Sequence, residues 1–275
     1  MQLSETVRRF TYSSFAGACI RGLGLRKVMQ SAYAGLLGNP DAVRLSLRGA
    51  EAMFASCTPH ELRCVESTWY SEREMLGGVL SRLRDGDVFL DVGSNLGMFS
   101  IFAAKVVGPG GVVIAFEPET LAHCRLVKNI GLNGLGNIKH FKMALSDGRA
   151  MKRLVLGDPE ALSQSAHVAD EEGPSEVVES VDYDWLAVNY SLPVPRVVKM
   201  DIEGYEFAAL RGMRVALSNP LCTALFCEVH PLGLPDGIGI DDVIRLANTY
   251  GFDFVQSQKR GEQVHVVATK TSVSA

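Results

Sequence analysis

The chain has 275 residues, of which 47% are hydrophobic and 21% are charged, and its net charge is −4. This composition is that of an ordinary globular protein with enough apolar residues for one α/β domain and an appendage. The negative net charge gives no electrostatic footprint for nucleic acid, so a nucleic-acid substrate is not expected.

The cysteines and the apolar runs point to a reducing compartment. The six cysteines form no C-x-x-C pair and no zinc-like spacing with histidines, so free thiols are expected. No apolar run approaches the ~18 residues of a membrane span. Arg21 ends the apolar run of residues 15–20 too early for a signal peptide. A cytoplasmic location is therefore expected.

The N-terminal part of the chain differs from the rest in charge. Residues 1–40 carry a charge of +4, which leaves −8 for the remainder. A basic amphipathic segment can lie on an anionic membrane surface, although a solvated helix face that covers a core is the more common arrangement. We predict a mostly helical N-terminal extension over residues 1–66, with room for a short hairpin in residues 51–66. The main domain is predicted to span residues 67–275.

A helix is predicted from Trp69 to Leu83, because apolar residues recur there at helical spacing. Its first turns carry Glu72 and Glu74, which suit a helix N-terminus. The same end can also face a cofactor pocket, and Glu74 is a candidate cofactor contact on that reading.

The next stretch has the pattern of a β-turn-α-β unit. Residues 88–90 form a short apolar run, typical of a buried strand, that stops at Asp91. Gly93 and Gly97 bracket a turn, a helix is expected from residue 98, and a second apolar run ends in Glu117-Pro118. Glu117 lies twenty positions after Gly97, where nucleotide-binding α/β folds place the carboxylate that binds ribose hydroxyls.

The loop of this unit favours S-adenosylmethionine over a dinucleotide. A dinucleotide fingerprint reads G-x-G-x-x-G, with bare amides for the pyrophosphate. Here the loop is led by an acid, which is a poor neighbour for pyrophosphate but a good one for the sulfonium and ammonium groups of S-adenosylmethionine. The glycines leave room for a ligand close to the backbone. The predicted cofactor contacts here are Asp91, Gly93, Ser94, Asn95, Gly97, Glu117 and Pro118.

The remaining elements alternate between strands and helices. A helix is expected at 121–130, followed by a strand at 138–145 that ends in Ser146 and Asp147. Those two residues could bind adenine or simply form a turn. Two extra strands are expected at 154–156 and 177–181, joined by a long polar loop. The later elements are a helix from 184, strands at 197–200 and 224–229, a helix at 241–250, and strands at 252–255 and 264–268.

Polar residues recur where the predicted strands end. They follow the strands at positions 91, 117, 147, 201 and 228–230. Ligands in open α/β sheets bind at the carboxyl ends of the strands, so these tips are expected to converge on one site.

Several of these segments, in this order, resemble the FkbM family of S-adenosylmethionine-dependent methyltransferases. The resemblance covers about residues 70–270 and rests on Asp91-Val-Gly-Ser-Asn-Leu-Gly, Phe116-Glu-Pro, Ala144-Leu-Ser-Asp, Lys199-Met-Asp-Ile-Glu-Gly-Tyr-Glu and Glu228-Val-His-Pro. It implies a Rossmann-like class I methyltransferase fold, in which a seven-stranded, mostly parallel sheet with an antiparallel last strand is flanked by helices. It also implies O-methylation of a hydroxyl on a sugar, glycolipid or natural product.

The mechanism needs a group that takes a proton from a weakly nucleophilic hydroxyl. Asp201, at the tip of its strand, is the first candidate for this base. His230 is the second, because histidine ordinarily titrates near working pH. Glu203 is a further candidate at the catalytic centre, and Glu206 and Glu228 are candidates for holding the acceptor. We predict no metal site, although Asp201, Glu228 and His230 together are conceivable ligands.

Two other functions compete with this interpretation. A nicotinamide-dependent oxidoreductase is opposed by the missing third glycine and by the acid that leads the loop. A non-catalytic binding module that retains the cofactor pocket is opposed by the full set of polar strand tips. The acceptor itself and the oligomeric state are not indicated by the sequence.

Overall fold

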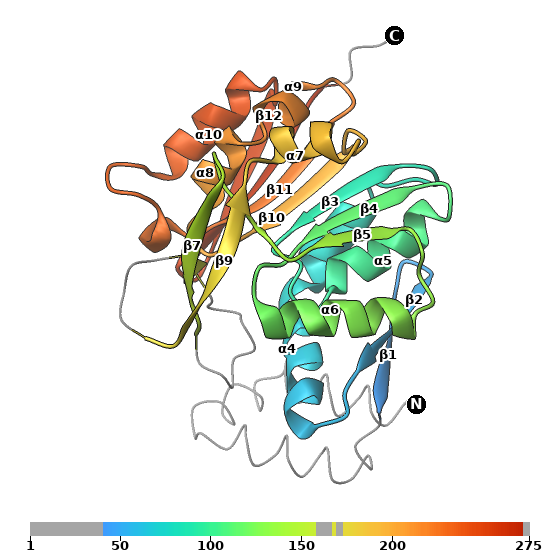
Figure 1. The fold of residues 1–275 in the computed structure, drawn as a ribbon. Coiled ribbons are helices and arrows are strands. Elements are labelled where there is room, and N and C mark those ends of the chain that lie inside the picture. Colours follow the sequence, from blue (N-terminus) through green and yellow to red (C-terminus); the bar gives the residue numbers. More distant parts are fainter. Residues whose placement is uncertain (1–40, 158–166, 169–172, 272–275) are drawn as a thin grey trace.

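The computed structural model describes residues 41–157, 167–168 and 173–271. These residues form a central sheet with helices on both faces, a smaller sheet beside it and an N-terminal hairpin (Figure 1). The basic segment of residues 1–40, with its predicted helices and membrane contact, lies outside the described residues.

The central sheet has the seven strands that the family resemblance implies. They run in the order β12-β13-β11-β10-β3-β4-β5, and β13 is antiparallel to both of its neighbours while the other pairs are parallel. The strands are β3 (Val88–Val92), β4 (Val112–Phe116), β5 (Ile138–Phe141), β10 (Val197–Asp201), β11 (Ala224–Val229), β12 (Phe254–Arg260) and β13 (Gln263–Thr269). The predicted α/β fold class is confirmed by this sheet.

Alternating side chains divide the core into two layers. Along β3, Phe89 packs in one apolar cluster and Leu90 in the other, because successive residues of a strand point to opposite faces. One face is covered by α4 (Pro59–Leu80), α5 (Met98–Val107) and α6 (Thr120–Leu132). The other is covered by α7 (Tyr183–Asn189), α8 (Glu206–Arg211), α9 (Arg214–Ser218) and α10 (Ile240–Thr249).

The strand order reverses between β3 and β10. From β3 the chain proceeds to β4 and β5 on one side, and it later returns to place β10 against the other side of β3. In open α/β sheets such a reversal opens a crevice at the carboxyl ends of the two strands, where ligands bind. The ends of β3 and β10 are therefore the expected position of the site.

The predicted domain boundary between residues 66 and 67 falls inside α4. This helix begins at Pro59, ten residues before the predicted start, because Thr58 and Glu61 form a reciprocal capping box. The preceding residues form a hairpin of β1 (Ala42–Leu47) and β2 (Ala50–Ala55) rather than helices. Its apolar side chains, Val43, Leu45 and Phe54, join the same buried cluster as α4 and α5, so the hairpin is part of the main core.

A second sheet is built from the segment that interrupts the β-α alternation. Its strands are β6 (Ala144–Leu145), β7 (Ala150–Val155), β8 (His167–Val168) and β9 (Ser175–Val181), in the order β6-β9-β7-β8. The two extra strands expected in this region are β7 and β9. The strand predicted at 138–145 is divided, since residues 138–141 pair with β4 and residues 144–145 pair with β9.

A short 3-10 helix, Pro231–Gly233, follows β11. Among the helices of the described residues, none has both the length and the apolar character needed to cross a membrane.

Candidate active site

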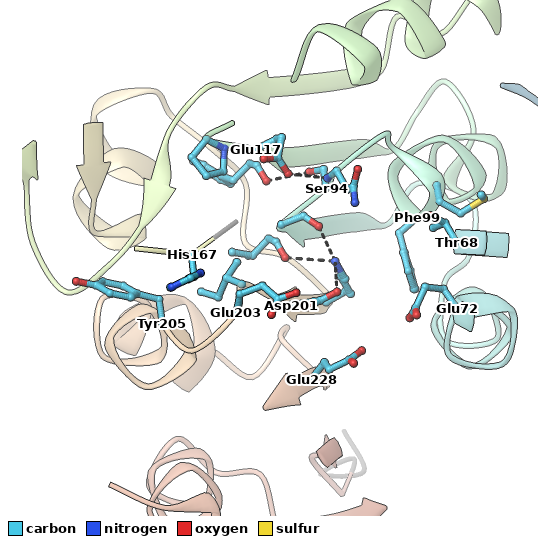
Figure 2. A pocket seen from close by; sticks show the side chains of 18 of the residues that line it. Thr68, Glu72, Ser94, Phe99, Glu117, His167, Asp201, Glu203, Tyr205 and Glu228 are labelled. Carbon is cyan, nitrogen blue, oxygen red and sulfur yellow. Dashed lines mark hydrogen bonds and ion pairs between the residues drawn. The ribbon is translucent and has the colours of Figure 1, made fainter. Parts of the chain in front are cut away.

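A cavity of about 450 Å³ lies at the carboxyl ends of the central strands (Figure 2). It brings together Gly93, Ser94, Asn95, Glu117, Pro118, Asp201, Glu203 and Glu228, which the sequence places on four separate strand tips. Further lining comes from α4 with Thr68 and Glu72, from β8 with His167, and from the β12–β13 hairpin with Arg260 and Gln263.

The loop after β3 passes directly against the end of β10. Gly93 has a φ of +77°, and a Cβ built on it would lie 1.9 Å from the main-chain oxygen of Asp201. No other residue fits there, which explains this glycine. Gly97 has a φ of +89° and stands at the start of α5, where a Cβ would meet Leu126 rather than the cavity. Gly97 therefore shapes the loop and does not line the cavity.

Glu117 is held at the tip of β4 by two main-chain donors. Its Oε2 accepts from the amide of Asn95 at 2.7 Å, and its Oε1 accepts from the amide of Glu119 at 3.0 Å. The side chain lines the cavity although the residue is buried, and this burial raises its pKa to about 7. The carboxylate is thus fixed in orientation while it faces the ligand space.

Asp91 does not line the cavity, and its partners in the structure are side chains of the protein itself. The residue is fully buried, it accepts from Ser100 Oγ at 2.5 Å, and its cation is Lys199, whose Nζ lies 3.6 Å from Asp91 Oδ1. Burial opposes the charge on Lys199, but the carboxylates of Asp91 and Asp201 outweigh it and raise its pKa. The acid that leads the loop is therefore neutralised within the chain.

Asp201 and Glu203 line the opposite half of the cavity (Figure 2). Burial raises the pKa of Asp201 to about 6, against the opposing effect of Lys199, whose Nζ lies 3.8 Å from Asp201 Oδ2. Burial likewise raises the pKa of Glu203 to about 7, against the effect of His230. Glu203 has a φ of +53°, a left-handed conformation that is uncommon outside glycine. Two proton acceptors with pKa values near neutrality thus face the same space.

The surroundings of His230 favour its protonated form, which cannot accept a further proton. Burial lowers its pKa, but the hydrogen bond with Glu206 and the nearby carboxylates outweigh this and raise it to about 9. Its Nδ1 lies 2.7 Å from Glu206 Oε1. These carboxylates therefore favour the protonated form of His230, which does not fit the expectation that it titrates near working pH. The sequence does not reveal this pairing, because Glu206 meets His230 only in the fold.

The two acids predicted to hold the acceptor have different surroundings. Glu206 is fully buried at the start of α8, where its Oε1 also accepts from the amide of Gly204 at 3.0 Å. It does not line the cavity, so it acts on His230 rather than on an acceptor. Glu228 does line the cavity, and its Oε2 lies 3.0 Å from His265 Nε2.

Comparison with known proteins identifies the family. The sequence model of the methyltransferase FkbM domain matches residues 91–254, which is more than half of the chain. The chain belongs to the FkbM methyltransferase family. This membership favours methyl transfer over the nicotinamide-dependent alternative. The matched residues also include the segments that suggested the family from the sequence.

Two characterised relatives of this FkbM-family chain are methyltransferases. It is 27% identical over 191 residues to the hexuronic acid methyltransferase AglP of Haloferax volcanii, covering 67% of this chain and 73% of that protein. It is 26% identical over 221 residues to the 31-O-demethyl-FK506 methyltransferase FkbM of Streptomyces tacrolimicus, covering 68% and 82%.

Comparison with solved structures found methyltransferases among the similar chains. The methyltransferase FkbM of Methylobacillus flagellatus KT shares 16% identity with a TM-score of 0.48, and the match covers 68% of this chain but only 44% of that one. The precorrin-6y C5,15-methyltransferase of Geobacter metallireducens GS-15 shares 14% identity with a TM-score of 0.46, covering 72% and 88%.

Besides Asp91 and Gly97, three further residues predicted to contact the cofactor do not line the cavity. Glu74 is exposed on α4, and Glu72, two positions earlier on a different side of the helix, lines the cavity instead. Ser146 is buried and its amide donates to Val181, while Asp147 is exposed and lies 3.5 Å from Arg211. The division of the predicted strand brings residues 143–145 to the cavity and turns 146–147 away.

The cavity also contains residues that the sequence analysis did not select. Lys199 could have been found, because a lysine inside the apolar run of residues 197–200 needs a buried carboxylate partner. Tyr205 stands in the segment 199–206 that carries the family resemblance, but no role was assigned to it. His167, Arg260 and Gln263 come from elements far apart in the chain, and no local pattern marks them.

Proposed function

We propose that this chain transfers the methyl group of S-adenosylmethionine to a hydroxyl oxygen of a sugar, glycolipid or natural product. One observation carries the proposal: a single cavity has Glu117 at one side and the carboxylates of Asp201, Glu203 and Glu228 at the other (Figure 2). The first suits a ribose, and the others suit a hydroxylated acceptor. The two relatives named for a hexuronic acid and for a demethylated hydroxyl support an oxygen acceptor.

The residues around Glu117 fit the proposed cofactor. The Glu117 carboxylate is fixed by two amides and retains lone pairs for ribose hydroxyls. Gly93 keeps the loop free of a side chain, and Phe99, Met143 and Leu145 provide apolar surface within the same cavity. When bound, S-adenosylmethionine supplies a methyl group that is electrophilic because it is attached to a sulfonium.

In this proposal, the residues in the other half of the cavity bind the acceptor and take its hydroxyl proton. Methyl transfer is an in-line displacement, so its rate depends on how well the acceptor hydroxyl is oriented and shielded from water. Asp201 is the proposed base: it takes the hydroxyl proton as the oxygen gains the methyl group. Glu203 and Glu228 accept hydrogen bonds from neighbouring hydroxyls and fix the acceptor in the required direction.

Two measurements test this proposal. Isothermal titration calorimetry should detect binding of S-adenosylmethionine and no binding of NAD⁺. Incubation with cofactor labelled in its methyl group should then label members of a panel of glycans, glycolipids and polyhydroxylated natural products, and mass spectrometry should locate the methyl group on oxygen. A protein that does not bind S-adenosylmethionine, or that methylates only nitrogen or carbon, would overturn the proposal.

A further inference from the structure

Three potential metal ligands converge at the edge of the cavity. They are Asp201 at the end of β10, Glu203 in the following turn and His230 after β11. His230 Nε2 lies 3.7 Å from Asp201 Oδ1 and 3.4 Å from Glu203 Oε2. One ligand atom from each residue can be chosen so that all three lie within 4.8 Å of one another.

These separations are close to those of a coordination sphere. Bonds of about 2.1 Å place neighbouring ligand atoms about 3.0 Å apart in an octahedral site and about 3.4 Å apart in a tetrahedral one. Small side-chain movements therefore suffice to bring the three groups onto one ion. We infer that Asp201, Glu203 and His230 bind a divalent cation.

The orientation of the His230 ring supports this inference independently of the distances between the three ligands. Its Nδ1 faces Glu206, which is fully buried, so its Nε2 is directed toward the two carboxylates. Metal-binding histidines typically give their second ring nitrogen to a carboxylate in this way. The other oxygen of Glu206, Oε2, has no hydrogen-bond partner among the described residues, so this buried carboxylate lacks full local compensation.

The charges around the three ligands also favour a cation. Asp201, Glu203, Glu206 and Glu228 provide four carboxylates in this region. Lys199 is shared between Asp201 and the fully buried Asp91, and His265 lies against Glu228. The carboxylates that favour a proton on His230 favour a metal ion beside its Nε2 as well.

Two carboxylates and one imidazole suit a divalent transition metal such as Mn²⁺, with positions left open for other ligands. Asp201 and Glu203 line the cavity, so those positions face the ligand space. The amide of Gln263 lies 3.0 Å from His230 Nε2, and its terminal group can rotate to offer the metal its oxygen. A bound cation would lower the pKa of an acceptor hydroxyl, a role that rests on the proposed function. Asp201 would then bind the cation through Oδ1, the oxygen that faces His230, and keep Oδ2 for the hydroxyl proton. The binding of the cation does not depend on the proposed function.

Direct titration with Mn²⁺ tests the site without reference to turnover. Protein treated with a chelator and then freed of it is titrated with MnCl₂, and free Mn²⁺ is followed by electron paramagnetic resonance. We expect saturable binding of a single ion per chain. Glu203→Gln and His230→Gln should each raise the Kd by about tenfold or more. Glu179→Gln, which alters a half-buried acid that pairs with Arg149 and does not line the cavity, should leave the Kd unchanged.

Circular dichroism tests whether each variant is folded. If His230→Gln is unfolded, the Kd of Glu203→Gln alone tests the metal site. Absence of saturable binding, or an unchanged Kd in Glu203→Gln, would overturn the inference. Binding of S-adenosylmethionine is measured on the same samples. Absence of saturable Mn²⁺ binding together with normal cofactor binding rejects the metal site and leaves the proposed function standing. Saturable Mn²⁺ binding without cofactor binding rejects the proposed function alone.

Discussion

Lys199 Nζ lies 3.6 Å from Asp91 Oδ1 beneath the floor of the cavity. The same ammonium donates to the main-chain oxygen of Gly93 at 2.6 Å, so one side chain joins the end of β10 to the loop after β3. Both residues are almost completely inaccessible to solvent. The pair therefore holds together the two strands between which the cavity opens.

Removal of one partner from this pair should be costly. Lys199→Met leaves the buried Asp91 carboxylate without its cation, and we expect a loss of about 3–5 kcal/mol in the free energy of unfolding, measured with urea. The double variant Lys199→Met/Asp91→Asn should recover much of this loss, because it removes the charge and keeps an acceptor for Ser100. Lys139→Met, at an exposed position, is the matched control. A Lys199→Met protein as stable as the parent would contradict this account.

The proposed contact between Glu117 and the ribose can be tested by comparison with Glu74, which the sequence also suggested as a cofactor contact. Glu117→Ala removes a charged acceptor whose hydrogen bonds contribute roughly 1.5–3 kcal/mol each, so affinity for S-adenosylmethionine should fall at least about tenfold. Glu74→Ala should have no effect, because Glu74 is exposed and does not line the cavity. Calorimetry on both variants provides the comparison. Equal affinities in the two proteins would remove Glu117 from the cofactor site.

Affinity for the cofactor should also depend on pH through Glu117. Burial raises the pKa of this carboxyl to about 7. Ribose hydroxyls need an ionised acceptor, so below that pH binding must first remove a proton from Glu117. We expect affinity to increase from pH 6 to pH 8 and then level off, with a loss of up to about tenfold per pH unit on the acidic side. In Glu117→Gln the affinity should be weaker at every pH and lack this rise.

Part of the fold and part of the candidate site could be predicted from the sequence. The unit from Val88 to Glu117 was predictable, because apolar runs and glycines specify a strand, a turn and a helix locally. The seven-stranded sheet with its antiparallel last strand followed from the family resemblance, whereas the order of the strands was seen only in the structure. The partner of Asp91 was not predictable, since Lys199 lies more than a hundred residues away.

The expected positions of Glu74 and Glu206 differ from those in the structure, because the local sequence around each of them fits two arrangements. Glu72 and Glu74 both suit the first turns of a helix, but the actual helix begins earlier, and only its rotation decides which of the two faces the cavity. Glu206 was selected for the acceptor because it follows a strand tip. Its complete burial against His230 depends on packing between β11 and α8.

The base assignment predicts a specific kinetic pattern. If Asp201 takes the hydroxyl proton in the transition state, Asp201→Asn should lower kcat by about 10²–10⁴ and leave cofactor affinity nearly unchanged. An increase in the acceptor KM with little change in kcat would indicate that Asp201 only anchors the acceptor. Steady-state kinetics at saturating cofactor distinguish these outcomes. Near-normal turnover at saturating acceptor would exclude Asp201 and direct attention to Glu203.

The contact between Gly93 and the main chain of Asp201 links the two halves of the cavity. A Cβ at position 93 would stand 1.9 Å from the Asp201 oxygen, so the two backbones touch without any intervening side chain. A shift of this loop around one ligand is therefore expected to be felt at the residue that faces the other. If the chain binds a methyl donor and an acceptor as proposed, equilibrium binding should show that one of them changes the affinity for the other, and independent affinities would contradict this coupling.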